Sequence, residues 1–361
     1  MDKGITNRQI FFILVLIVSA FQATNVPHLA AKALGRSGWI MIALYAVPFS
    51  LFALMIAKLN GMYPGMTLFE YGQILLGKVM TSILCILYAL YFFSVIVYLN
   101  LNTLTLISTN ILPKTPQPFL LVAAVLLFGF VVYKGIETIA RLFELIGAMY
   151  LIVTLGICLL MLTQGERENI LPLYNPNEGK EFVSAILVFG SIYGGLENLL
   201  MVPFTEENPK TPKTAFIAML FIGLLFILIT EGSIGLLGVN NAIVYNDAFL
   251  EAVKLADAPV IERTDIFYLT FGLGSLFSGV IMLINSQVEI LSRLFPSVKR
   301  GVIVSVVCIL VYGLTLFVMK IPFYTKTFGE VVPVLIFFFA GIVPTLLFVL
   351  ARIRKRSLSP K

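Results

Sequence analysis

Long apolar runs separated by short polar segments constrain the fold of this chain more than any other sequence feature. Each run has about the 20 residues needed to cross a lipid bilayer as a helix. Hydrophobic residues make up 59% of the 361 residues and charged residues only 12%, with a mean hydropathy of +0.98. Soluble globular domains do not reach this composition. The sequence therefore predicts an all-α membrane protein that forms a single transmembrane domain over residues 1–361.

Ten transmembrane helices are predicted from these runs. They fall at residues 9–31, 38–58, 79–110, 118–134 and 138–163, and then at 182–203, 213–239, 265–291, 299–319 and 330–351. The first five would form one repeat over about 9–163, and the last five a second repeat over about 182–351. Because each half has an odd number of spans, the two halves would cross the membrane in opposite directions, as in an inverted repeat.

Basic residues orient the predicted bundle. With the N-terminus inside, cytoplasmic segments carry 16 of the 25 Lys and Arg residues. Five of the 16 belong to a short basic tail at 352–361, which would anchor the last helix at the cytoplasmic leaflet. Both termini are therefore predicted to be cytoplasmic. The net charge of +6 is accounted for by this pattern and does not indicate a nucleic-acid partner.

Two of the predicted spans are interrupted in the middle. In the first, Thr24 and Asn25 precede Pro27, which suits the start of a second half-helix. In the sixth, Gly190, Gly194 and Gly195 loosen the chain. Irregular backbone at membrane depth survives only where protein or a water-filled cavity satisfies it. Matching breaks in the two halves predict a ligand site, although a proline kink and close glycine packing would explain the same residues without one.

Polar side chains in the apolar spans are further candidates for this site. Carboxylates at membrane depth are functional candidates by default, here as a proton, cation or polar site. These carboxylates are Glu197, beside the second break, and Glu231, in the seventh span. The hydroxyls that could line the same cavity are Ser191 and Tyr193 in the sixth span, Tyr98 in the third, and Ser275 and Ser278 in the eighth.

No nucleotide-binding loop, zinc motif or serine–histidine set is present in the sequence, so no enzymatic activity, catalytic residue or cofactor is predicted. The three cysteines, Cys85, Cys158 and Cys308, lie inside apolar runs without the spacing of metal ligands. The only histidine, His28, is interpreted as a packing residue. No metal site is expected.

Short motifs along nearly the whole chain resemble the B subunit of spore germinant receptors, an integral membrane family of the amino acid–polyamine–organocation transporter superfamily. The motifs are Ile5–Gln9, Tyr63–Tyr71, Leu76–Lys78, Leu112–Pro116, Gly135–Glu137, Ala140–Glu144, Gly194–Glu197 and Val260–Asp265. The resemblance implies a leucine-transporter type of fold with broken helices 1 and 6. It also implies the inner membrane of the spore of an endospore-forming bacterium as the location.

This family resemblance further implies a function and partners. A small nutrient germinant, such as an amino acid, would bind in a midplane pocket between helices 1, 3, 6 and 8. An A subunit and a lipoprotein C subunit would be the partners of the chain in the lipid bilayer. By this resemblance the ligand-binding residues are Thr24, Asn25, Gly190, Ser191, Tyr193, Gly194 and Gly195, with Glu197 as a further candidate. Two alternatives stay open: a proton- or sodium-coupled amino acid transporter, and a germinant-gated conduit for ions or small solutes.

Overall fold

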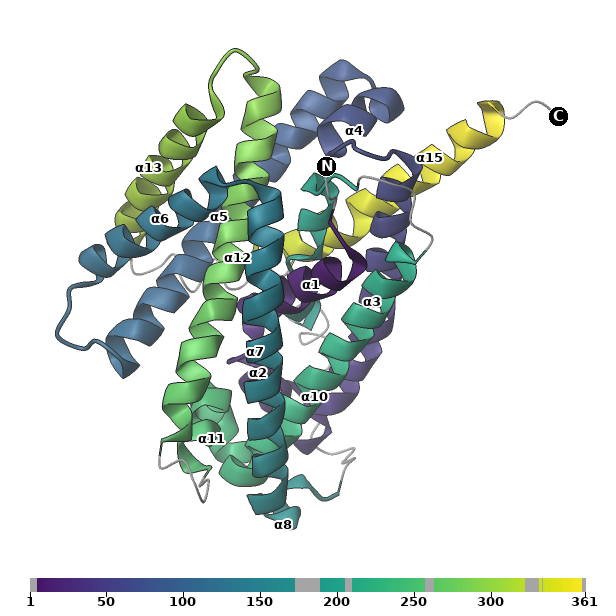
Figure 1. Ribbon diagram of the computed structural model, residues 1–361. Coiled ribbons are helices and arrows are strands. Elements are labelled where there is room, and N and C mark those ends of the chain that lie inside the picture. The colour runs from purple at the N-terminus through teal and green to yellow at the C-terminus, as the bar shows by residue number, and fades with distance from the viewer. Residues whose placement is uncertain are drawn as a thin grey trace.

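A computed structural model describes residues 5–172, 189–204, 210–256, 263–321, 331–332 and 334–358. The described residues form a helical bundle (Figure 1). Seven helices in this part of the chain are long and apolar enough to cross a membrane, and two shorter apolar helices, α1 and α6, accompany them. The predicted all-α membrane architecture is confirmed at this level. The sixth and tenth predicted spans extend partly outside the described residues.

Helices of the first half follow the predicted apolar runs closely. The first run is split into α1 (Asn7–Gln22) and α2 (Val26–Leu34), and the short η1 (Gly35–Ser37) leads from α2 into the next helix. The remaining elements are α3 (Gly38–Met62), α4 (Leu68–Leu76), α5 (Lys78–Asn110), α6 (Gln117–Tyr133), α7 (Ile136–Gln164) and α8 (Arg167–Ile170).

Elements of the second half are less regular at its start. Two short 3₁₀ segments, η2 (Ser191–Tyr193) and η3 (Leu196–Met201), stand where the sixth span was predicted. They are followed by α10 (Thr211–Val244), α11 (Ala248–Leu255), α12 (Thr264–Leu294), α13 (Arg300–Met319), the π-helical η4 (Phe337–Ile342) and α15 (Val343–Leu358).

Packing places α1 in the centre of the bundle. It contacts α12, α7 and α10, as well as η2 and η3. In Figure 1, α3 and α10 lie on one side of α1, and α5, α6 and α13 lie on the other. The small helix α4 lies at one end of the bundle, and α8 and α11 lie at the opposite end (Figure 1).

Candidate functional site

The first break separates α1 from α2 by three residues. Gln22 ends α1, and Pro27 is the second residue of α2, where its missing N–H costs no helical hydrogen bond. Asn25 directly precedes α2, as predicted, but its side chain makes no capping hydrogen bond. Its Oδ1 atom is buried and has no hydrogen-bond partner within the described residues. The N-terminus of α2 is therefore not closed by its own cap.

Residues from the α10–α11 connection cover this break. The Phe249 N–H donates to the Thr24 carbonyl oxygen at 3.2 Å. The Thr24 hydroxyl donates to the carboxylate of Asp247, which lies outside the membrane-spanning helices. Burial raises the pKa of the Asp247 carboxyl, while the hydrogen bond from Thr24 opposes the rise. The break is thus held by a segment more than 200 residues away in the sequence.

Glycine geometry defines the second break. Gly190 has helical dihedral angles, so the chain departs from a helix only after Tyr193. Gly195 has φ +101°, a left-handed conformation that favours glycine. A Cβ atom added to Gly194 would lie 2.7 Å from a Phe21 ring carbon. One added to Gly195 would lie 2.9 Å from the same ring and closer still to Ile17. The two glycines therefore let the second break pack directly on α1.

A closed hydrogen-bond network surrounds Glu197, which is fully buried. One carboxylate oxygen accepts from the Tyr91 hydroxyl of α5 at 2.8 Å, and the other accepts from the Gly195 N–H at 3.0 Å. The Asn198 side chain donates to the Gly195 carbonyl at 2.9 Å and accepts from the Ser286 hydroxyl of α12 at 2.7 Å. This network links η3 to both α5 and α12.

A small polar cavity lies beside the first break, between α1, α7 and α12. It measures about 10 Å³, close to the minimum that one water molecule needs. Its lining residues are Ser19, Ala23, Thr24, Tyr150, Tyr268, Gly272, Ser275 and Leu276. The Ser275 hydroxyl donates to the Leu16 carbonyl of α1 at 3.0 Å and so ties α12 to α1. In this conformation the cavity is too small for an amino acid.

The predicted site residues separate into two groups. Thr24 and Ser275 line this cavity, and Gly194 and Gly195 contact the α1 helix that forms its wall. The other group consists of Tyr193, Ser278, Tyr98 and Glu231, none of which lines the cavity. Ser191 is buried in η2.

Each residue of the second group has a different environment. Tyr193 points away from α1, because its hydroxyl donates to the Ile42 carbonyl of α3 at 2.9 Å. Ser278 donates to the Gly274 carbonyl of its own helix. Tyr98 is partly buried on α5. Glu231 is half-buried in α10, with an Oε1 atom that has no hydrogen-bond partner in the described part of the chain.

Four polar residues of the cavity region were not among the predicted site residues. Ser19, Tyr150 and Tyr268 lie within the helices α1, α7 and α12 and line the cavity. Asp247 lies in a connecting segment and reaches Thr24 from outside. The isolated hydroxyls inside helices at 19, 150 and 268 were the available signal. Their common cavity depends on helix packing, which a single sequence does not specify.

Sequence comparison relates the chain to spore germination proteins. Three of its relatives come from Bacillus subtilis (strain 168). Spore germination protein YndE is 22% identical over 77% of each chain. Spore germination protein KB is 26% identical over 74% of this chain and 73% of its own length, and spore germination protein B2 is 24% identical over 70% of both.

Structural comparison relates the fold to membrane transporters. The structure of Mhp1, a nucleobase–cation-symport-1 family transporter with bromovinylhydantoin bound, aligns with a TM-score of 0.68 at 17% identity, covering 97% of this chain and 79% of that one. A Na⁺-coupled sialic acid symporter aligns with a TM-score of 0.61 at 13% identity, covering 98% of this chain and 88% of that one. MhsT in complex with L-phenylalanine aligns with a TM-score of 0.62 at 14% identity, covering 95% of this chain and 88% of that one.

These likenesses agree with the all-helical fold of the described residues. The sequence relatives are described as germination proteins, and the proteins of similar fold as transporters. The family model for spore germination proteins matches residues 4–325, which is most of the chain. The chain is an integral membrane protein and belongs to the spore germination protein family.

Proposed function

We propose that this chain is the nutrient-sensing subunit of a spore germinant receptor. A small nutrient such as an amino acid would bind where the breaks of α1–α2 and η2–η3 face α12 and α5. The observation that carries this proposal is the direct packing of Gly194 and Gly195 on Ile17 and Phe21 of α1, just before the first break. Thr24 and Ser275 line a small cavity on another face of α1. Two irregular backbone segments that meet inside a helical bundle are the usual ligand site of this type of fold.

The proposal includes the complete topology of the family. The chain would have ten spans in a leucine-transporter type of inverted repeat, with the first and sixth spans broken. Both termini would face the spore core from the inner membrane. An A subunit and a lipoprotein C subunit would be its partners. The likeness to symporters of known structure supports the fold, and membership of the germination family supports the location.

Nutrient binding would change the conformation of the bundle. The cavity of about 10 Å³ has no room for an amino acid, so binding requires α1 or α12 to move. Movement would break the Ser275–Leu16 hydrogen bond and separate α1 from the second break. A ligand shifts such an equilibrium only by binding the open state more tightly than the closed one. Partner subunits would detect the open state.

A coupled amino acid transporter is the second candidate function. Its support is the likeness to cation symporters, one of them described as Na⁺-coupled. In this function Glu197 or Glu231 would bind the coupling proton or cation. Glu197 has the better position because its neutral partners, Tyr91 and Gly195, connect it to the second break. A germinant-gated conduit for ions or small solutes would use the same residues.

Purified protein in liposomes distinguishes sensing from transport. Radiolabelled amino acids are tested one at a time for saturable binding, for counterflow and for accumulation driven by proton or sodium gradients. The sensor predicts saturable binding of at least one nutrient without accumulation. Gradient-driven accumulation by the isolated subunit would instead establish the transporter. Failure to bind any nutrient in the presence of both partner subunits would refute the proposed site.

Substitution of a glycine at the second break tests the location of the site. Gly194→Leu would insert a side chain against Phe21 and should abolish nutrient binding. Gly313→Leu is the matched control, because an added Cβ atom at Gly313 of α13 has no atom within 4 Å. Both variants must first show wild-type amounts of folded protein in the membrane. Unchanged binding by Gly194→Leu would place the site elsewhere.

A further inference from the structure

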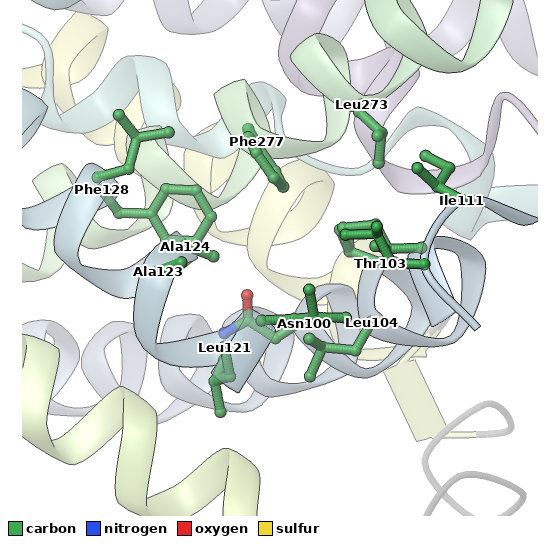
Figure 2. Close-up of a pocket in the computed structure, with 14 residues that line it drawn as sticks. Asn100, Thr103, Leu104, Ile111, Leu121, Ala123, Ala124, Phe128, Leu273 and Phe277 are labelled. Atoms are coloured by element: carbon green, nitrogen blue, oxygen red, sulfur yellow. The ribbon is translucent and has the colours of Figure 1, made fainter. Parts of the chain in front are cut away.

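A second and larger cavity lies between α5, α6 and α12, away from both breaks. It measures about 300 Å³. Figure 2 shows Leu273 and Phe277 of α12 across the cavity from Asn100 and Leu104 of α5. Helix α6 closes one wall with Leu121, Ala123, Ala124 and Phe128. Drug-sized ligands occupy cavities from about 300 Å³ upward, so this one can enclose a small organic molecule.

The lining is apolar except at two residues of α5. Leu, Ile, Ala and Phe side chains provide the walls, and no charged side chain is among the lining residues. Asn100 and Thr103 are the polar exceptions and are 3% and 4% exposed. The Thr103 hydroxyl oxygen is covered by protein atoms and does not face the cavity, whereas Figure 2 shows the Asn100 side-chain oxygen directed toward Phe277 across the cavity. The Asn100 side chain donates to the Thr315 hydroxyl at 3.5 Å, a long hydrogen bond.

Two aromatic rings form one end of the cavity. Phe128 of α6 and Phe277 of α12 pack edge to face, with ring centroids 5.2 Å apart. The cavity is open toward the membrane face of the bundle, where Leu127 and Ile111 are 46% and 40% exposed. A ligand could therefore enter from the lipid without passing through the nutrient site.

We propose that this cavity binds a neutral, mainly apolar small molecule that carries one hydrogen-bonding group. An ionised group is excluded because it would be desolvated without a charged partner. A hydroxyl of the ligand donates to the side-chain oxygen of Asn100, since a desolvated polar group without a partner is costly. The carbon skeleton of the ligand lies against the Phe128–Phe277 pair. A lipid acyl chain would fill the volume but would offer no donor to Asn100.

Helix α12 connects this cavity to the smaller one at the first break. Leu273 and Phe277 face the larger cavity, whereas Ser275 lines the smaller one. An occupant of the larger cavity therefore contacts the same two turns of α12 that hold α1. Any effect of the occupant on nutrient affinity rests on the proposed function, whereas its binding does not.

Photolabelling of the full chain in lipid nanodiscs tests the proposal. The probe is trifluoromethyldiazirinyl benzyl alcohol, which is neutral, mainly apolar and carries one hydroxyl. Mass spectrometry should find adducts on peptides of α6 and α12 that contain Leu127 and Phe277. Unlabelled benzyl alcohol should suppress these adducts in a saturable manner. No nutrient takes part in this measurement, so its outcome is independent of the nutrient site.

Two variants and one control complete the test. Asn100→Leu keeps the approximate shape of the side chain but removes its amide, and it should weaken probe binding by about 5- to 100-fold. Ala124→Phe should abolish labelling by filling the cavity. The control is Thr105→Val, since the exposed Thr105 hydroxyl bonds only to the Leu101 carbonyl of its own helix. Thermal unfolding verifies that all three variants are folded.

Three outcomes would overturn the proposal. The first is labelling that is insensitive to both Asn100→Leu and Ala124→Phe. The second is labelling that benzyl alcohol does not suppress. The third concerns a phospholipid that carries a diazirine in its acyl chain. If this lipid labels the same residues and benzyl alcohol does not displace it, the cavity is a groove for annular lipid.

Discussion

The two breaks at the centre of the bundle are closed in different ways. At the second break, Gly195 donates to the Glu197 side chain and accepts from Asn198, so residues of η3 itself satisfy the backbone. At the first break, Thr24 accepts from Phe249 and donates to Asp247, both in a distant connection. The second break is closed by its own residues, whereas the first break has a local hydrogen bond from the Asn25 N–H to the Gln22 carbonyl and also depends on separate elements of the fold.

This difference indicates which part of the site moves. The turn at Gly194–Gly195 can keep its geometry when its surroundings shift, because its own hydrogen bonds do not depend on them. The α1–α2 turn loses hydrogen bonds whenever the α10–α11 connection or α12 moves away. We therefore expect η2–η3 to be the rigid wall of the site and the α1–α2 break to be the part that rearranges. Four substitutions test this comparison.

The largest effect is expected for Gly195→Ala at the second break. Alanine at φ +101° is strained, and its Cβ would overlap Ile17 and Phe21. Strain and overpacking together should lower the free energy of unfolding by about 2–6 kcal/mol. The measurement is the thermal unfolding midpoint of purified protein in detergent. Gly313→Ala is the control and should not lower the midpoint. A Gly195→Ala midpoint equal to wild type would mean that the second break is not rigid.

A smaller loss is expected for Tyr91→Phe. The variant removes the hydroxyl that donates to Glu197 and leaves a fully buried carboxylate with one fewer donor. A hydrogen bond to a charged group contributes about 1.5–3 kcal/mol, which is the expected destabilisation. Tyr133→Phe on α6 serves as the control, because this ring is 58% exposed. Equal unfolding midpoints for the two variants would show that the Glu197 network does not stabilise the second break.

Much of this fold could be predicted because bilayer thickness imposes a length on each helix. The run predicted at 79–110 is α5 (Lys78–Asn110), and the run at 118–134 is α6 (Gln117–Tyr133). The Gly194–Gly195 break was also visible, because adjacent glycines have a strong local effect on the backbone. The extent of the irregular backbone could not be predicted. The segment η3 is a 3₁₀ helix through Met201, although a membrane helix was predicted there.

Partners across the bundle could not be predicted from the sequence. Glu197 was recognised as a buried carboxylate, but its donor Tyr91 is 106 residues away. Asp247 was not recognised, because nothing near it in the sequence indicates that it meets Thr24. Side chains that interact across helices depend on rotation and depth, which hydrophobic runs leave undetermined. A single sequence therefore located the breaks but not the residues that close them.

At the first break, Ser275→Ala should have a moderate effect. The variant removes the hydrogen bond from α12 to the Leu16 carbonyl, which is worth about 0.5–1.5 kcal/mol. Ser278→Ala is a matched control on the same helix, because the Ser278 hydroxyl returns to Gly274 of α12. Equal unfolding midpoints for the two variants would mean that this hydrogen bond does not hold α12 to α1, and that α12 does not close the first break.

The smallest effect is expected for Asp247→Asn, and it should depend on pH. Burial raises the pKa of Asp247 in the folded protein above its unfolded value of 3.8, so the folded state binds the proton more tightly. Protonation of Asp247 therefore favours folding at low pH, and this contribution is lost as pH rises through the folded pKa. Asparagine stays neutral and can still accept from Thr24.

Consequently, the unfolding midpoint of Asp247→Asn relative to wild type should be highest near neutral pH and should fall as pH is lowered toward 4. A difference between the two proteins that is independent of pH would mean that the carboxyl is not buried against Thr24, and that the first break is not closed by the α10–α11 connection.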